Sequence, residues 1–151
     1  MSRGDDLRRV DRALSRIGRI ALGRQAARHR CERSGISLSG PAIAILACLR
    51  VRGPMRLSDV ARDTNLEAPL VSRETRALVD GGYVRRGPHA TDGRVSIVEL
   101  TDRGREASET YRAAADAITA EVFQRWSASE IKQLAAQLER VASEFSRPLG
   151  A

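Results

Sequence analysis

The sequence predicts a mainly α-helical chain with a small β wing, arranged as a winged helix-turn-helix. Three observations predict this fold class. Apolar residues recur at helical spacing over most of the chain, two short helical patterns flank a turn at Thr64-Asn65, and two β-rich runs follow with turn-forming residues between them. A short helix, a turn, a second helix and a hairpin in this order are typical of a module that reads DNA.

The apolar faces of the two short helices define their extent. Leu57, Val60 and Ala61 share one helical face, which predicts a first helix over residues 57–62. Asn65 can supply the turn because asparagine tolerates a left-handed backbone. The second helix is predicted between residues 67 and 80. Its expected inward face consists of Val71, Thr75, Leu78 and Val79.

The opposite face of the second helix carries the candidate DNA contacts. Arginine can make bidentate contacts to guanine in the major groove, and proline in a first helical turn loses no hydrogen bond. Residues of these kinds repeat at i, i+3, i+4 and i+7 on this face. We therefore assign the major-groove contacts to Ser72, Arg73 and Arg76, with Pro69 as an apolar contact.

A hairpin is expected after the second helix. Gly81-Gly82 should end that helix, with one glycine in the left-handed conformation. Two strands are predicted over residues 83–86 and 95–100, with turn chemistry at 87–93. The residues expected to face the core are Val84, Val98 and Leu100, and Thr101 is expected to cap the next helix.

Helices are predicted on both sides of this module. The N-terminal helix should end near Cys31, and a second helix that begins at the Ser39 cap is apolar nearly all round, which predicts a central place in the core. A helix over residues 102–125 and a last helix after the Ser127–Glu130 capping box carry further apolar stripes. The stripe of the N-terminal helix, which predicts a partner helix, is Leu7, Val10, Leu14, Ile17 and Ala21.

Five segments resemble the MarR (multiple antibiotic resistance regulator) family of transcription factors in order and spacing. They are LSDVA at 57–61, LVSR at 70–73, LVDGGYVRR at 78–86, DGR at 92–94 and LTDRG at 100–104. The DGR wing followed closely by LTDRG is the most specific of these motifs. The resemblance covers nearly the whole chain and implies a transcriptional regulator, most often a repressor.

The resemblance also implies the domain organisation. Residues 1–151 would form one MarR-like domain, with 1–38 and 102–151 as dimerisation helices and 39–101 as the winged lobe. The first and last two helices of family members interlock with those of a second subunit. A homodimer would bind double-stranded DNA at an inverted repeat with half-sites about 10 bp apart.

The wing adds further candidate DNA contacts. Arg94 resembles the wing arginine of the family, and arginine favours the narrow minor groove of A·T-rich DNA. Asp92 would orient it, although the two side chains could instead pair only to stabilise the hairpin. Arg85, Arg86 and His89 are weaker candidates for phosphate contacts.

Charge and composition are consistent with this function. Residues 1–100 hold 19 arginines against 11 carboxylates, and residues 101–151 hold seven basic residues against eight acidic ones. This asymmetry predicts a positive field in the DNA-reading half, although 25 of the 26 basic residues are arginine, which genomic base composition could explain in part. No signal-peptide pattern or membrane-length apolar run is present, so we expect a cytoplasmic protein that does not bind membranes.

The sequence says least about regulation. The family resemblance implies a small aromatic or phenolic effector bound between the dimer helices and the winged lobe. By placement, Arg24 and Tyr111 would be its polar contacts, although each candidate could equally be an ordinary core or surface residue. The full set of candidate lining residues is Ile17, Ala21, Arg24, Ala47, Cys48, Tyr111 and Ile118.

The cysteines leave a redox alternative open. Cys31 is flanked in sequence by arginines that favour a thiolate, but the reactive cysteine of thiol-sensing family members lies nearer the start of the first helix. Cys48 is expected in the core. No metal site, cofactor or enzymatic activity is expected, because no matching motif is present. An architectural or protein-interaction module is the remaining alternative, since fold alone does not settle function.

Overall fold

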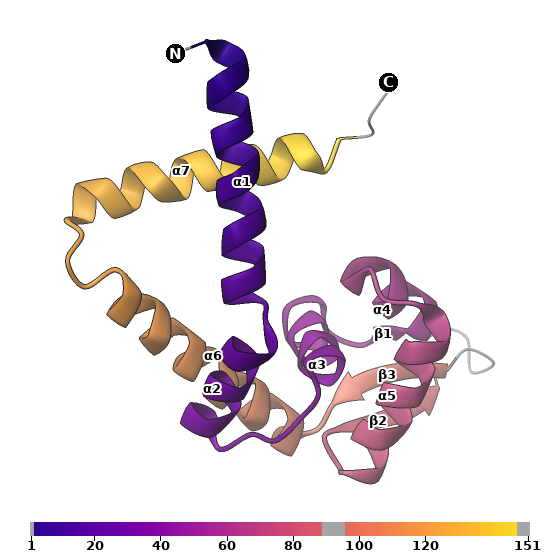
Figure 1. Ribbon diagram of the computed structural model, residues 1–151. Helices are drawn as coiled ribbons and strands as arrows, with labels where there is room; N and C mark the ends of the chain where they lie inside the picture. Colours follow the sequence, from indigo (N-terminus) through magenta and orange to yellow (C-terminus); the bar gives the residue numbers. More distant parts are fainter. Residues whose placement is uncertain (1, 89–95, 148–151) are drawn as a thin grey trace. The chain divides into compact units, whose positions relative to one another are not determined.

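The computed structural model describes residues 2–88 and 96–147, which are mainly helical with one small antiparallel sheet (Figure 1). The predicted fold class is confirmed. The helices are α1 (Arg3–Ala21), α2 (Arg24–Ser34), α3 (Gly40–Arg52), α4 (Leu57–Thr64), α5 (Ala68–Asp80), α6 (Asp102–Val122) and α7 (Ala128–Phe145). The strands are β1 (Met55–Arg56), β2 (Val84–Pro88) and β3 (Ser96–Leu100).

The chain forms two compact units, Met1–Ala115 and Asp116–Ala151, with the boundary inside α6. The first unit holds the winged lobe together with α1, α2 and the start of α6. The second unit holds α7 and the end of α6. No helix among the described residues is both long and apolar enough to cross a membrane.

The core of the winged lobe is formed by α3, α4, α5 and the sheet. Ile45 and Leu46 of α3 are completely buried, which confirms the central place predicted for this apolar helix. Val60 of α4 and Leu78 of α5 pack in the same cluster. The strand residues predicted to face the core are also buried: Val84, Val98 and Leu100.

Local turn chemistry fixes the helix-turn-helix. Asn65 ends α4 in the left-handed conformation, with φ of 53°, as its residue type predicts. Gly82 follows the end of α5 with φ of 73°, which confirms that one glycine of the pair is left-handed. The amide of Tyr83 then donates to the Leu78 carbonyl at 2.9 Å, so the chain turns directly from α5 into β2.

The sheet has three strands rather than the two predicted. β2 and β3 pair as the expected antiparallel hairpin, with Val84 opposite Leu100 and Arg86 opposite Val98. β1 adds to the other edge of β3, where Met55 lies opposite Val98. A two-residue strand has too few positions to show an alternating pattern, so no residue pattern indicated it.

The N-terminal segment forms two helices, not the single helix expected. α1 ends at Ala21, and Gly23 is the N-cap of α2 in an extended conformation. A Cβ at Gly23 would overlap the Arg19 carbonyl oxygen, so the close approach of these two backbone segments requires glycine. Cys31 therefore lies near the end of α2.

The C-terminal helices are bounded close to their predicted ends. α6 ends at Val122, three residues earlier than predicted, and residues 123–125 form a turn. Ser127 then caps α7: its hydroxyl oxygen accepts from the Glu130 amide at 3.3 Å, and the Glu130 carboxylate accepts from the Ser127 amide at 2.8 Å. This reciprocal pair is the predicted capping box.

The start of α6 is fastened to the end of α5. The Thr101 hydroxyl donates to the Gly82 carbonyl at 2.6 Å and accepts from the Gly104 amide at 3.1 Å. A Cβ at Gly104 would overlap the Tyr83 carbonyl oxygen, which explains the glycine at this position. Thr101 and Gly104 thus fix where α6 leaves the winged lobe.

Candidate nucleic-acid interface

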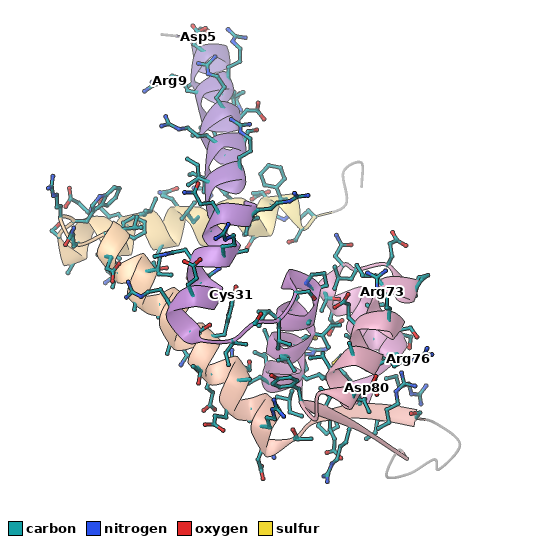
Figure 2. The ribbon with its side chains drawn as sticks, turned by 60° about the horizontal axis from the view of Figure 1, so that its bottom comes forward. Asp5, Arg9, Cys31, Arg73, Arg76 and Asp80 are labelled. Atoms are coloured by element: carbon teal, nitrogen blue, oxygen red, sulfur yellow. The ribbon has the colours of Figure 1, made fainter. Side chains whose placement is uncertain are left out.

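The candidate interface is the outer face of α5. Its inner face is anchored in the core by Val71, Thr75 and Leu78, each at most 1% exposed. Because these residues recur every three or four positions, the opposite side of the helix must face outward. Figure 2 shows Arg73 and Arg76 on that outer side.

The structure brings together the four α5 residues proposed for the major groove. Pro69, Arg73 and Arg76 are exposed, and Ser72 is half-buried. Pro69 lies in the first turn of α5, where its missing N–H costs no hydrogen bond. The four residues therefore form one continuous outward strip at the positions a recognition helix uses.

Glu74 lies at the base of this strip. An ion pair between Arg73 and Glu74 was an alternative open from the sequence, whereas the contact of Glu74 with Ser39 was missed. The Glu74 carboxylate accepts from the Ser39 hydroxyl at 2.6 Å and lies 3.4 Å from the Arg73 guanidinium. The Glu74 side chain is 15% exposed, whereas that of Arg73 is 75% exposed. Glu74 therefore ties the Arg73 side chain to the N-cap of α3, 35 residues earlier in the chain.

The strand arginines differ from each other. Arg85 donates to Glu99 on the neighbouring strand at 2.7 Å, in register with it, so its charge is partly neutralised. Arg86 is exposed on β2. His89, Asp92 and Arg94 lie outside the described residues, so their proposed roles stay predictions from the sequence.

A cation–π contact joins α6 to Tyr83, a residue between α5 and β2. The Arg103 guanidinium of α6 lies 4.6 Å from the centroid of the Tyr83 ring. Such a cation–π contact holds the arginine over the ring face. Arg103 belongs to the LTDRG motif, which predicted the start of α6 but did not predict this contact.

The seven proposed effector contacts are spread over four helices. Ile17, Ala21 and Arg24 are exposed on the N-terminal helices, Ala47 and Cys48 are half-buried on α3, and Tyr111 is half-buried on α6. Ile118 belongs to the second unit. Arg24 lines a hollow at the bend between α1 and α2, together with Arg19, Ile20, Arg28 and His29.

Tyr111 already has a protein partner. Its hydroxyl accepts from Nε of Arg30 at 3.1 Å, while the same guanidinium donates to the Ala21 carbonyl at 2.9 Å. Arg30 of α2 therefore links the C-terminal end of α1 to α6. The sequence did not signal this link, because its partners are 81 residues apart.

The two cysteines have different surroundings. Burial, with a smaller contribution from the charge of Asp63, raises the pKa of the Cys48 thiol above its ordinary value, so this thiol is a weaker nucleophile at neutral pH. The Cys48 sulfur lies 3.7 Å from that of Met55. Cys31 is half-buried, with its sulfur 3.9 Å from the Leu38 carbonyl oxygen.

Known proteins match this chain in sequence and in fold. An HTH-type transcriptional regulator of Bacillus subtilis, YdgJ, is 28% identical over 113 residues, which are 75% of this chain and 68% of that protein. Two further curated regulators are matched over 47% and 64% of their lengths. The chain thus spans roughly half to two thirds of these relatives.

Solved structures agree with this match. A probable transcriptional regulator from Pseudomonas aeruginosa is 28% identical, with a TM-score of 0.68 over 87% of this chain and 98% of that one. A MarR family protein from Bacillus stearothermophilus shares the fold, with a TM-score of 0.83 over 97% of this chain and all of that one, at 17% identity. The MarR family model matches residues 38–96, which hold α3, α4, α5, β1 and β2. The chain is therefore similar to MarR family transcriptional regulators over its helix-turn-helix segment, and it shares the fold of a solved MarR family protein.

Proposed function

We propose that this protein is a homodimeric repressor that binds an inverted-repeat DNA site and is released from it by a small-molecule effector. The observation that carries the DNA-reading part is the outward strip on α5. Pro69, Arg73 and Arg76 project from a helix whose opposite face is completely buried. A rigid helix that presents arginines is suited to contacts with guanine in the major groove.

Exposed apolar residues support the homodimer. On α1, Leu7 and Ile17 are 61% and 55% exposed, and on α7, Leu138 and Phe145 are 44% and 75% exposed. An exposed apolar stripe along a helix is typical of an interaction site. A second copy that covers both helices would place two α5 helices on one duplex and make the preferred site palindromic.

The effector is the third part of the proposal. Its support is the family resemblance, with the seven sequence-proposed residues as candidates and Arg24 as the one that lines the hollow at the bend. We propose a small aromatic or phenolic ligand. Ligand binding would weaken DNA binding if it favoured a dimer whose two α5 helices no longer match the half-site spacing.

The DNA-reading proposal is tested with the intergenic DNA upstream of the protein's own gene. Binding of wild type and Arg76→Ala is measured against this DNA and against a random duplex of equal length. We expect wild type to prefer its own site by about 10³-fold or more, and Arg76→Ala to lose about 1–3 kcal/mol of that preference. Equal affinity of wild type for both duplexes would indicate an architectural protein instead.

Repression and release need a separate assay. A reporter gene behind the same intergenic DNA should be silenced by the wild-type protein and not by Arg76→Ala. Salicylate is a suitable first phenolic probe, and it should restore expression and weaken DNA binding in vitro. Silencing that persists with a panel of phenolic probes would argue against the effector part while leaving DNA recognition intact.

A further inference from the structure

The N-terminal helices carry most of the net positive charge of the chain. Residues 1–38 hold ten arginines against four carboxylates, a net charge of +6, whereas residues 39–101 hold nine arginines against seven carboxylates, a net charge of +2. The positive field expected for the DNA-reading half therefore comes mainly from outside the winged lobe. This distribution is unexpected for a protein that binds DNA through α5 alone.

Five of the six arginines of α1 share one face. At about 100° per residue, the helix places five arginines within a sector about 100° wide, opposite the apolar stripe that begins at Leu7. If a second copy covers the apolar stripe, this face stays in solvent. The five residues are Arg8, Arg9, Arg12, Arg16 and Arg19.

Neutralisation of these charges is incomplete. Arg8 pairs with Asp5 at 2.6 Å, and Figure 2 shows both Asp5 and Arg9 near the N-terminal end of α1. Within the described residues, Arg12, Arg16 and Arg19 are exposed and form no ion pair. Like charges three and four residues apart destabilise a helix, and a bound polyanion would remove this repulsion.

The surface around these three arginines is hollowed. Arg12, Arg16 and Arg19 line a shallow groove along α1, which Asp11 and Ile20 also line. Arg19 also lines the hollow at the bend, where Arg24 and Arg28 extend the basic surface onto α2. Arg28 is partly neutralised by Glu32 at 3.5 Å. The unpaired charge is therefore centred on Arg12, Arg16 and Arg19, which we call the α1 arginine face.

We propose that the α1 arginine face binds the phosphate backbone of double-stranded DNA, at a site separate from α5. The inference rests on the proposed dimer, in which α1 is exposed on its arginine side only. The three residues are spaced by about 6 and 4.5 Å along the helix axis, so their guanidinium groups can reach successive phosphates. Such contacts read no sequence, and they would raise general DNA affinity or hold a second duplex.

The position of the arginines favours DNA over a lipid surface. A helix that lies in a membrane interface inserts its apolar face, with its cationic side chains above it. Here the apolar stripe of α1 is assigned to the dimer and is not available for insertion. A long rigid polyanion, in contrast, needs only the arginine side of the helix.

The test compares two variants with the same change in charge. Arg12, Arg16 and Arg19 are replaced together by Gln, and a control variant carries Gln at Arg125, Lys132 and Arg140, which are exposed in the second unit. Affinity for a random duplex is measured from low to moderate salt. We expect the α1 variant to lose roughly tenfold in affinity, with a log–log salt slope lower by about two to three per chain, and the control to change little.

Each other outcome overturns the proposal. An equal loss in both variants would indicate net charge alone, and no loss in either would indicate a merely solvated face. Loss of binding to vesicles of phosphatidylserine and phosphatidylcholine, with DNA binding unchanged, would assign the face to lipid. Sedimentation checks that both variants are dimers. If the triple variant does not fold, Arg16→Gln should lower the slope by about one.

The experiment also separates this proposal from the proposed function. Preference for the protein's own intergenic DNA over a random duplex depends on α5 and should be lost in Arg76→Ala. The same preference should be kept in the α1 variant, whose affinities for both duplexes fall together. Sequence preference retained with unchanged general affinity would refute the α1 site and leave the DNA-reading role of α5 standing.

Discussion

At the scale of single residues, the junction between α5 and α6 depends on one missing side chain. Gly104 lies in the first turn of α6, directly against the Tyr83 carbonyl oxygen, and its amide donates to the Thr101 hydroxyl. This carbonyl oxygen belongs to the backbone and accepts from the Thr101 amide, while the Tyr83 amide donates to the Leu78 carbonyl. Tyr83 therefore has little freedom to move aside. A side chain at Gly104 would have to push α6 away from the winged lobe.

Gly104→Ala should therefore lower the free energy of unfolding by at least about 2 kcal/mol, as overpacked sites do. Urea unfolding followed by circular dichroism measures this change. Gly40→Ala is the matched control, because Gly40 is also helical but has open space around its Cβ position. Its effect should stay within about 0.5 kcal/mol. Equal unfolding free energies of the two variants would show that the backbone at the junction can shift to accept a Cβ.

Glu74 contacts both the N-cap of α3 and Arg73, one of the proposed DNA contacts. A carboxylate beside the proposed DNA-contacting strip would repel phosphate, and it pairs with Arg73. Glu74→Gln keeps a side chain of the same shape and an acceptor for Ser39, but it removes the charge. A unit charge at about 4 Å in water contributes about 1 kcal/mol, so general DNA affinity should rise by roughly fivefold.

The discriminating measurement for Glu74→Gln is the ratio of affinities for the protein's own site and a random duplex. This ratio should fall, because a released Arg73 can contact any phosphate. Glu67→Gln, at the exposed N-cap of α5, controls for the removal of one negative charge from the same helix. If both variants shift the ratio equally, the restraint of Arg73 by Glu74 has no role in specificity.

At the scale of secondary structure elements, prediction succeeded where the determinants are local. Asn65, the Gly81-Gly82 pair and the Ser127 cap act within four residues of themselves, so their residue types were enough to place α4, α5 and the start of α7. β1 depends on backbone segments that meet in space, and its two residues carried no signal. The break at Gly23 is an exception, since the Arg19 carbonyl lies only four residues earlier and the residue pattern still did not indicate it. The Ser39–Glu74 and Arg30–Tyr111 contacts join distant segments, which no periodicity can indicate.

The capping box of α7 gives a pH-dependent prediction. Hydrogen bonds from the Ser127 amide and hydroxyl lower the pKa of Glu130 from its ordinary value. A carboxyl with a lowered pKa in the folded state stabilises that state above the unfolded pKa, and this stabilisation is lost as the pH falls through the folded pKa. The first turn of α7 should therefore loosen on acidification.

Ser127→Ala removes the hydroxyl partner of this box. The pKa of Glu130, followed by NMR titration of its side-chain carboxyl, should move up towards its ordinary value, and amides in the first turn of α7 should exchange faster. Ser129→Ala is the control, because Ser129 is exposed and lies two residues after Ser127. An unchanged Glu130 titration in Ser127→Ala would mean that the hydroxyl contributes nothing to the cap.

At the scale of the whole molecule, the distribution of apolar surface separates two kinds of helix. α3 is buried on most sides and holds the lobe together, whereas no residue of α1 or α7 is fully buried. Isolated helices gain stability mainly from packing of an apolar face. Helices of 19 and 18 residues with exposed apolar stripes therefore have a physical need for a partner, which the proposed second copy would supply.

The proposed dimer predicts a sharp contrast between two substitutions that each add one charge at an exposed apolar site. Leu138→Glu places a carboxylate in the stripe of α7, where the second copy would desolvate it, and Val51→Glu places one at the end of α3, at a side chain that is 70% exposed. Burial of an unpaired charge costs several kcal/mol. Sedimentation equilibrium should show a dimer dissociation constant at least about 100-fold higher for Leu138→Glu and unchanged for Val51→Glu.

The same two variants are expected to differ in DNA binding. A dimer contacts both half-sites of an inverted repeat at once, so loss of the dimer also removes the gain from the second contact. Leu138→Glu should bind a full site no more tightly than a single half-site, whereas Val51→Glu should keep the preference of wild type for the full site. A Leu138→Glu protein that remains a dimer and keeps this preference would show that α7 does not form the subunit interface.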